Sequence, residues 1–442
     1  MLPVNFDMDL LPPSQPCPPP NASPAILPDE LIAEVLSFLP VKSLMQLRSV
    51  CKSWKSIVED PTFVKFHLYR SSQKPDLAFV TSIYATEALT FTICRLFENP
   101  SDVINLPNND SYYQLKDKGC LGIVGSCNGL LCLLGGISFD GSCYYKDMFL
   151  RFWNPATKTL SDKLGCLGDG DSDISLFNFH RLKFAFGYDN SSNTYKAVYF
   201  ILDTTIVRVF SIGNNVWRSI QNSPVASRHY SAVVHLSGSV ILVAIRNYTT
   251  KYYDCKDITI KQFVIISLDF GTEKYTQLRP PQGFDQVPFL MPNLSVLEDC
   301  LCFSHDFEQT HFVIWQMKEF GVEESWTQFL RISYHNLQID IDSISPNMSS
   351  HWLPLCVSKK SGTLLLTNHD ELEAILFNLR DKRVERINGH WLSNGKEYVE
   401  SLFGVHGSTP LRDVASQFNR SQLLANAPSI ACYFLAFCIV YD

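Results

Sequence analysis

Cysteine and histidine are the residue types in this chain that could bind a metal or supply a nucleophile and a base, and their spacing favours neither role. The chain contains 14 Cys and 11 His in 442 residues. No Cys-x-x-Cys pair occurs, and Cys300 and Cys302 share a strand face without two further ligands at a suitable spacing. Others, such as Cys132 and Cys356, lie in apolar strands, where a free thiol behaves as a small hydrophobic group. We expect neither a metal site nor a disulfide framework.

Catalytic motifs are also lacking in the sequence. We find no G-x-S-x-G turn, no H-E-x-x-H helix, no phosphate-binding loop and no paired carboxylates. We therefore expect a protein that works by binding, with no catalytic residue and no cofactor. An enzyme remains an alternative class, and a bound metal or a substrate-dependent activity would support it.

Composition and charge indicate a folded protein that does not bind nucleic acid. Hydrophobic residues make up 46% and charged residues 18% of the chain, which is typical of globular proteins. Aromatic residues are frequent and favour a β-rich interior. The formal net charge is −7, and the densest basic stretch, 380–386, is interleaved with Asp381 and Glu385. Nucleic-acid binding usually requires a basic surface, so we do not expect that partner.

The two ends of the chain differ from its middle. Residues 1–26 contain eight Pro, no Lys or Arg and no apolar run of a signal peptide, which predicts a disordered leader and a cytoplasmic or nuclear protein. Residues 405–442 form an irregular tail of unknown role. Its apolar run, 430–441, is too short to span a bilayer, so a buried strand or an artefact of how the coding sequence was assembled remain the alternatives.

Residues 27–68 carry apolar side chains at helical spacing. Pro28 suits the first turn of a helix, Pro40 ends that helix, and a second helix begins near Lys42. Asp60-Pro61 has the form of an N-cap that opens a third. Three helices in about forty residues cannot bury all of this apolar surface among themselves, so a partner or the next domain must cover the remainder.

Three short motifs lie in the same stretch: Leu27-Pro28-Asp29-Glu30-Leu31, Leu39-Pro40 and Val50-Cys51-Lys52-Ser53-Trp54. In these motifs the stretch closely resembles the F-box, in the form common in plant proteins. One departure is Phe38, where members of that family often carry a basic residue. We expect Phe38 to modulate adaptor affinity without abolishing it.

The resemblance implies a hydrophobic interface with a Skp-type adaptor. It is formed by ten residues: Leu27, Pro28, Leu31, Ile32, Leu36, Leu39, Pro40, Val41, Leu44 and Leu47. The alternative is that several of them belong only to the core of the module, which we favour for Val35, Val50 and Trp54. For Leu27-Pro28 and Leu39-Pro40 we favour the interface, because proline at a helix end fills a core poorly.

A unit of two hairpins recurs from residue 122 onward. The first hairpins lie at 122–136, 184–200, 231–245, 294–305 and 355–368, and the second hairpins lie at 150–164, 207–220, 263–278, 312–330 and 374–387. Four antiparallel strands repeated about every fifty residues are typical of a propeller blade. Strands at 77–81, 90–96 and 398–403 would add a blade built from both ends and leave no open sheet edge. We therefore predict an all-β propeller, with six blades, behind an all-α module of three helices.

Several pieces of this repeat resemble the plant F-box-associated domain, which is kelch-like: Gly125-Ser126-Cys127-Asn128-Gly129-Leu130, Trp153-Asn154-Pro155-Ala156-Thr157, Phe186-Gly187-Tyr188-Asp189, Trp217-Arg218, the stretch 315–326 and Tyr398-Val399-Glu400-Ser401-Leu402. We expect the tryptophans to pack between blades. Target recognition would fall on the variable insertions 137–149, 165–181, 246–261 and 332–351.

The domain organisation that follows is a leader at 1–26, an F-box at 27–70, an F-box-associated propeller at 72–404 and a tail at 405–442. The resemblance implies a substrate-recognition subunit of an SCF-type E3 ubiquitin ligase, which joins a Skp-type adaptor and a cullin-RING ligase to an unknown protein substrate for degradation. One alternative is an F-box protein with a non-degradative binding role, and a propeller enzyme is a remote one.

Overall fold

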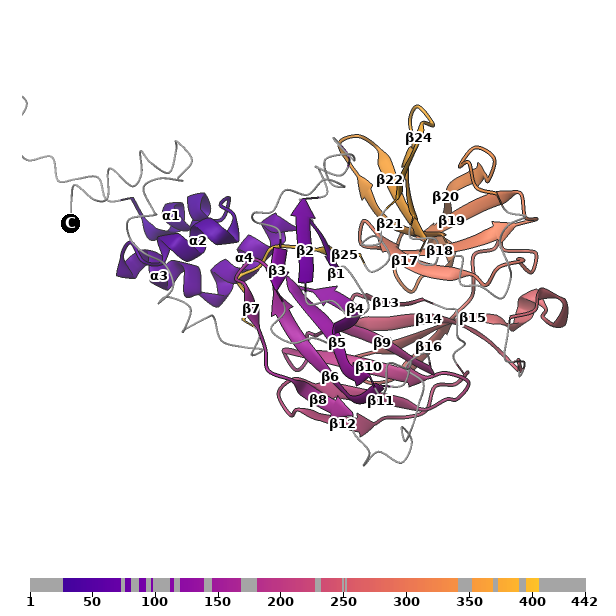
Figure 1. Ribbon diagram of the computed structural model, residues 1–442, viewed down its shortest axis with the longest axis horizontal. Helices are drawn as coiled ribbons and strands as arrows, with labels where there is room; N and C mark the ends of the chain where they lie inside the picture. The colour runs from indigo at the N-terminus through magenta and orange to yellow at the C-terminus, as the bar shows by residue number, and fades with distance from the viewer. Residues whose placement is uncertain are drawn as a thin grey trace, which may run out of the picture.

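A computed structural model describes residues 27–72, 76–80, 87–92, 97, 112–114, 120–138, 145–167, 181–226, 232–248, 250, 253–340, 352–368, 373–388 and 395–404. The expected leader, the expected tail and parts of all four variable insertions lie outside these residues. A small helical module, with the indigo colour of the N-terminal residues, lies beside a much larger β domain (Figure 1).

The module contains four helices, and the prediction of three was wrong. They are α1 (Asp29–Leu36), α2 (Val41–Leu47), α3 (Lys52–Glu59) and α4 (Pro61–Ser71). The expected second helix is divided, because Arg48 caps the end of α2 and Cys51 is extended, with φ −149° and ψ 166°. As predicted, Asp60 caps α4, and its side chain accepts hydrogen bonds from the backbone N–H groups of Phe63 and Thr62. Those bonds lower the pKa of Asp60, the bond from Phe63 having the largest effect.

Five propeller blades are built from consecutive strands. The first has β4 (Cys120–Cys127), β5 (Leu130–Ser138), β6 (Tyr145–Asn154), β7 (Thr159–Leu160) and β8 (Leu164–Leu167), and the second has β9 (Leu182–Asp189), β10 (Thr194–Ile201), β11 (Val207–Ser211) and β12 (Val216–Ser219). The third has β13 (Val233–Leu236), β14 (Ser239–Ile245), β15 (Phe263–Asp269) and β16 (Tyr275–Leu278). The fourth has β17 (Asn293–Leu297), β18 (Cys300–Phe307), β19 (His311–Met317) and β20 (Trp326–Ser333), and the fifth has β21 (Trp352–Ser358), β22 (Thr363–Asn368), β23 (Glu373–Asn378) and β24 (Val384–Asn388).

The blade count of six is corrected to five, because five of the described sheets are built from strands that follow one another along the chain, whereas the strands from the two ends form a sheet with a crossover. They form a sheet in the order β25-β1-β2-β3, from β1 (Asp76–Val80), β2 (Glu87–Thr92), β3 (Tyr112–Gln114) and β25 (Lys396–Tyr398). The two ends do share a sheet, as expected, with Asp76 paired to Tyr398. The strand expected at 398–403 ends at Tyr398, and the following residues leave the sheet.

The core lies between neighbouring blades, as a propeller requires. Alternate residues of β9 show this, since Phe186 packs toward the first blade and Ala185 toward the third. Trp153 is buried, and Trp217, Trp315 and Trp326 pack against these inter-blade clusters. The expectation that the tryptophans pack between blades is confirmed. The second to fourth blades are therefore covered on both faces by apolar side chains.

The first strands of the blades run in one direction, which separates the connections into two ends. Gly125 of β4 lies against Phe186 of β9, and the N–H of Ala232, before β13, donates to the Asn293 side chain at the start of β17. Tight turns such as Asn128-Gly129 therefore lie at one end of the propeller, the turn end. The strand ends that flank all four variable insertions lie at the opposite end, the loop end.

Candidate functional site

An apolar stripe runs along the exposed face of α1. It consists of Leu31 and Val35, which lie one turn apart on α1, with Leu27 before the helix and Phe38 after it. Their exposed fractions are 39%, 52%, 42% and 71%. Four exposed large hydrophobic side chains in one row are unusual for a surface that faces only water. The α1 stripe is the strongest candidate interface of the module.

The ten predicted adaptor-binding residues divide into two groups. Leu27, Pro28, Leu31 and Pro40 are exposed, and Ile32 and Leu39 are partly buried. The other four are buried within the module: Leu36, Val41, Leu44 and Leu47. Burial leaves these four no surface for a partner in this structure, because they fill the interior of the module, against which Leu402 packs. Val50 is partly buried and Trp54 is buried, as favoured.

Sequence reasoning missed Val35 as a surface residue and gave Phe38 only a modulating role. The signal was present, because Val35 lies four residues after Leu31 and Phe38 three residues after Val35. Arg70 of α4 lies over both neighbouring rings, with its guanidinium carbon 3.7 Å from the Phe38 ring centre and 4.5 Å from that of Phe66. Arg70 also pairs with Glu34. A basic group therefore lies beside Phe38, although it comes from α4.

A short segment after β25 fixes the module to the turn end of the propeller. Leu402 is buried among residues of the helical module. The Asn154 side chain donates to the carbonyls of Ser401 and Phe403, both at 2.9 Å. The Gly129 backbone, with φ +79°, passes so close to Ser401 that a β-carbon there would clash. Residues 399–403, the joint, thus contact the module and two turns of the first blade.

Two polar groups of the module lie next to this joint. The backbone N–H of Val41 donates to the Glu400 side chain at 3.1 Å, which satisfies one free donor at the start of α2. His67 is buried, and its Nε2 atom lies 2.9 Å from the Leu39 carbonyl oxygen. Burial lowers the pKa of His67 and outweighs the opposing effects of the Leu39 carbonyl and Glu400. The contact is therefore formed with a neutral imidazole.

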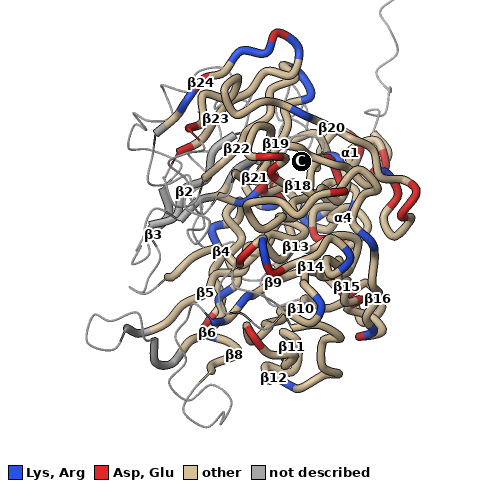
Figure 2. Tube along the Cα trace, turned by 90° about the vertical axis from the view of Figure 1, so that its right-hand side faces the viewer, with Lys and Arg blue, Asp and Glu red and all other residues tan. Residues whose placement is uncertain are grey.

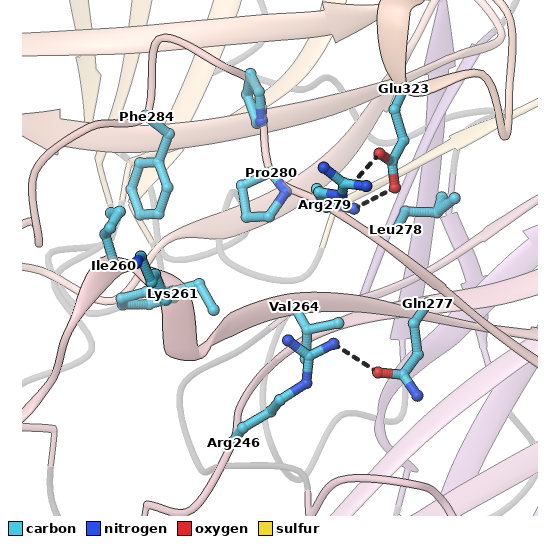
Figure 3. Close-up of a pocket in the computed structure, with 12 residues that line it drawn as sticks. Arg246, Ile260, Lys261, Val264, Gln277, Leu278, Arg279, Pro280, Phe284 and Glu323 are labelled. Carbon is cyan, nitrogen blue, oxygen red and sulfur yellow. Dashed lines mark hydrogen bonds and ion pairs between the residues drawn. The ribbon is translucent and has the colours of Figure 1, made fainter.

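A pocket of about 480 Å³, the rim pocket, lies between the third and fourth blades (Figure 3). Its walls come from the residue after β14, from η3 (Ile260–Gln262), from β15 and β16, from the segment after β16 and from η4 (Glu323–Ser325). Arg246 and Lys261 stand at the two ends of the variable insertion 246–261, with Arg279 across the pocket. The rim pocket therefore connects a rigid blade to one of the segments expected to recognise a target.

Charge and cysteine chemistry give no sign of a catalytic or metal centre in the part of the chain that the structure describes. Acidic and basic positions are interspersed along the described trace, including Asp381, Lys382 and Arg383 before β24 (Figure 2). Burial raises the pKa of Cys120 to about 11 and that of Cys302 to about 12, so these thiols stay protonated. In the described part of the chain, no group of three or more His, Cys, Asp or Glu could hold a metal ion, and no helix is long and apolar enough to cross a membrane.

Comparison with known proteins defines the class that this arrangement belongs to. Residues 25–66 match the model of the F-box domain, and residues 90–403 match that of the F-box associated beta propeller domain. The chain belongs to the plant F-box proteins with a C-terminal F-box-associated propeller domain. The resemblance found in the sequence motifs is confirmed.

Two relatives from Arabidopsis thaliana illustrate the similarity. The F-box/kelch-repeat protein At3g23880 is 27% identical over 324 residues, which is 70% of this chain and 80% of the relative. The F-box protein CPR1 is 26% identical over 387 residues, which is 82% of this chain and 84% of the relative. Among solved structures, a nidogen/laminin complex aligns with a TM-score of 0.38 at 9% identity. The alignment covers 74% of this chain and 99% of that chain. Both relatives carry the F-box in their names, and the first is also named a kelch-repeat protein.

Proposed function

We propose that this chain is the substrate-recognition subunit of an SCF-type E3 ubiquitin ligase. The F-box binds a Skp-type adaptor through the α1 stripe, with Pro28, Ile32, Leu39 and Pro40 beside it, and the propeller binds the target protein. The observation that carries this proposal is the row of exposed apolar side chains on a module that is otherwise well packed. No catalytic group of this chain takes part, because other subunits transfer ubiquitin.

The joint gives this proposal a geometric basis. The module contacts the turn end of the propeller through residues 399–403, whereas the variable insertions begin and end at the loop end. A target held at the loop end would stay at a fixed position relative to the adaptor. Fixed geometry raises the effective concentration of target lysines near the loaded ubiquitin-transferring subunit. We propose that the joint serves this purpose and that the complex works in the cytoplasm or the nucleus.

A non-degradative binding role is the second candidate. It shares adaptor binding with the first and differs in the fate of the bound protein. Membership of the family supports a binding subunit in either role. The lifetime of the bound protein therefore distinguishes the degradative role from the non-degradative one. A propeller enzyme would need a site that the described residues do not offer.

The test is a comparison of three forms of the full chain in plant cells. They are wild type, Leu31→Asp with Val35→Asp, and the control Val216→Asp, which places a charge at an apolar position of β12 that is 62% exposed. Adaptor and cullin should co-purify with wild type and the control but not with the double variant. At least one protein should have a shorter lifetime with wild type and with the control Val216→Asp than with the double variant, and blocking the proteasome should remove that difference. Loss of the adaptor from the control as well, or its retention by the double variant, contradicts the proposal.

A further inference from the structure

We infer that the rim pocket binds an acidic segment of the target, in which a carboxylate side chain lies next to an apolar one. This inference rests on the proposed function only in calling the bound segment part of a target. The charge of the pocket, its apolar floor and the way in which its basic groups are held all favour such a ligand.

The charge of the rim pocket is opposite to that of the whole chain. Three basic residues line it, Arg246, Lys261 and Arg279, against one acidic residue, Glu323. The formal net charge of the chain is −7. A locally basic pocket on an acidic protein selects an anionic ligand and repels a cationic one.

The basic groups are not equally available to a ligand. Glu323 engages Arg279 twice, through the backbone N–H at 2.8 Å and through the Nε atom at 3.3 Å. Arg246 donates from Nη2 to the Gln277 side chain at 2.7 Å, and its other guanidinium donors make no hydrogen bond or ion pair with a described residue. Lys261 is exposed and has no ion-pair partner among the described residues. The ligand carboxylate is therefore expected on the side of Arg246 and Lys261.

The chain holds the Arg246 backbone in place before any ligand binds. The Gln262 side chain donates to the Arg246 carbonyl, and the Arg246 N–H donates to the Gln262 carbonyl, both at 2.9 Å. Gln262 also accepts from the backbone N–H of Thr259 at 2.8 Å. These bonds close the base of the insertion 246–261, so binding does not have to order that base.

The apolar part of the pocket lies next to this basic side. Figure 3 shows Ile260 and Phe284 on the side of Lys261, with Pro280 near the Arg279–Glu323 pair. Phe284 is 5% exposed and is fixed by edge-on contacts to the rings of Phe263 and Phe303. The surface offers a rigid place for an aliphatic or aromatic side chain beside a carboxylate. The volume of about 480 Å³ suits two or three side chains of an extended segment.

The test uses fluorescein-labelled peptides of Gly and Ser that contain one Glu-Phe-Glu, Gln-Phe-Gln, Lys-Phe-Lys or Glu-Ser-Glu core. Each is titrated against the full chain by fluorescence anisotropy. We expect the Glu-Phe-Glu peptide to bind at least tenfold more tightly than each of the other three. Equal binding of the Gln-Phe-Gln or Lys-Phe-Lys peptide would overturn the role of charge, and equal binding of the Glu-Ser-Glu peptide would overturn that of the apolar surface. If free glutarate displaces the labelled peptide at an equal concentration, the inference that the pocket binds a peptide segment is overturned.

Two charge-reversal variants locate the site. Arg246→Glu with Lys261→Glu should weaken binding of the Glu-Phe-Glu peptide at least tenfold. The matched control, Lys256→Glu with Lys274→Glu, changes the net charge equally at exposed positions outside the pocket and should weaken binding less than threefold. Equal losses in both variants, or no loss in the first, would overturn the assignment. Adaptor co-purification is measured in parallel, so failure of the proposed function is seen separately from failure of this inference.

Discussion

The helical module and the propeller treat their apolar side chains in different ways. Among the described residues, the large hydrophobic side chains that are exposed are Leu27, Leu31, Val35, Phe38, Phe66 and Tyr69 in the module, and Val216 alone in the propeller. The propeller has the larger core, because each inner blade covers its neighbours. A module of four short helices has too little interior to do the same.

This difference indicates which residues of each region can contact a partner. In the module, the functional surface is the part that the fold leaves uncovered, so the exposed residues themselves indicate a partner. In the propeller, nearly all large apolar residues of the described chain serve the scaffold. We propose that recognition there depends on polar groups at blade ends, such as Arg246 and Lys261. Variants at buried positions and at exposed positions should therefore have different effects in each region.

The largest effect is expected for Leu44→Asp in the module. Leu44 is fully buried, so the variant places an unpaired charge in the core and should lower the free energy of unfolding of the module by about 3–5 kcal/mol. Amide hydrogen exchange should show loss of protection in α1–α4 while the propeller strands stay protected. Leu31→Asp is the matched control and should change stability by less than about 0.5 kcal/mol. Equal destabilisation by both variants would remove the distinction between core and stripe.

The propeller contains a buried ion pair between Lys196 and Asp189, and a substitution of Asp189 tests its contribution to stability. Asp189 accepts from Lys196 Nζ at 2.8 Å, and the two side chains are 3% and 7% exposed. Burial opposes ionisation of Asp189, but bonds from Lys196, Ser191 and Ser192 outweigh it and hold its pKa well below the usual range. Asp189→Asn should destabilise the propeller by about 2–4 kcal/mol, because Lys196 stays buried with one acid fewer.

Chemical denaturation measures this loss. The control Asp381→Asn removes an exposed carboxylate that pairs with Arg383 and should leave stability unchanged. Adaptor binding by the folded fraction of Asp189→Asn should equal that of wild type. A loss of adaptor affinity in that variant would show that the two regions are coupled more strongly than the joint suggests.

The free energy of unfolding is expected to depend on pH through Glu397, in the sheet that the strands from the two ends form. Burial raises the pKa of Glu397 to about 7, with Asp299 and Glu298 adding to the rise and Lys359 opposing it. A raised pKa means that the folded state favours the protonated acid, so its contribution to stability is complete below about pH 4.5 and is lost as the pH rises through 7. Glu397→Gln should differ from wild type by less than about 1 kcal/mol at pH 5 and be more stable by about 2–3 kcal/mol at pH 8.

Thermal unfolding of both forms between pH 5 and 8 tests this directly. The difference between the two curves isolates Glu397 from the other titrating groups. A constant difference across that range would contradict the raised pKa.

The smallest effect is expected at the joint. Glu400→Ala removes the acceptor of the Val41 N–H and should cost about 1 kcal/mol. Amide exchange at Val41 should become faster without unfolding of the propeller. Glu400→Gln keeps an acceptor oxygen and should restore most of the protection. Unchanged exchange in the alanine variant would mean that Glu400 does not fix the module.

Much of this architecture followed from the sequence, and the exceptions have physical causes. Hairpin repeats and the Asp60 cap were predictable because they depend on local pattern. The break between α2 and α3 was not, because the apolar residues on either side keep helical spacing while Cys51 turns extended. The departure of residues 399–403 from the sheet was also hidden, because Leu402 is apolar whether it packs on a blade or on the module. The rim pocket joins residues up to about eighty positions apart, which no local pattern reveals.

The central claim is that the α1 stripe binds the adaptor, and calorimetric titration of a purified Skp-type adaptor into the purified chain tests it most directly. For Leu31→Asp with Val35→Asp, we predict a loss of about 100-fold or more in affinity, with the melting temperature retained. Val216→Asp should bind as wild type does. Wild-type affinity in the double variant, or an equal loss in Val216→Asp, would contradict the account.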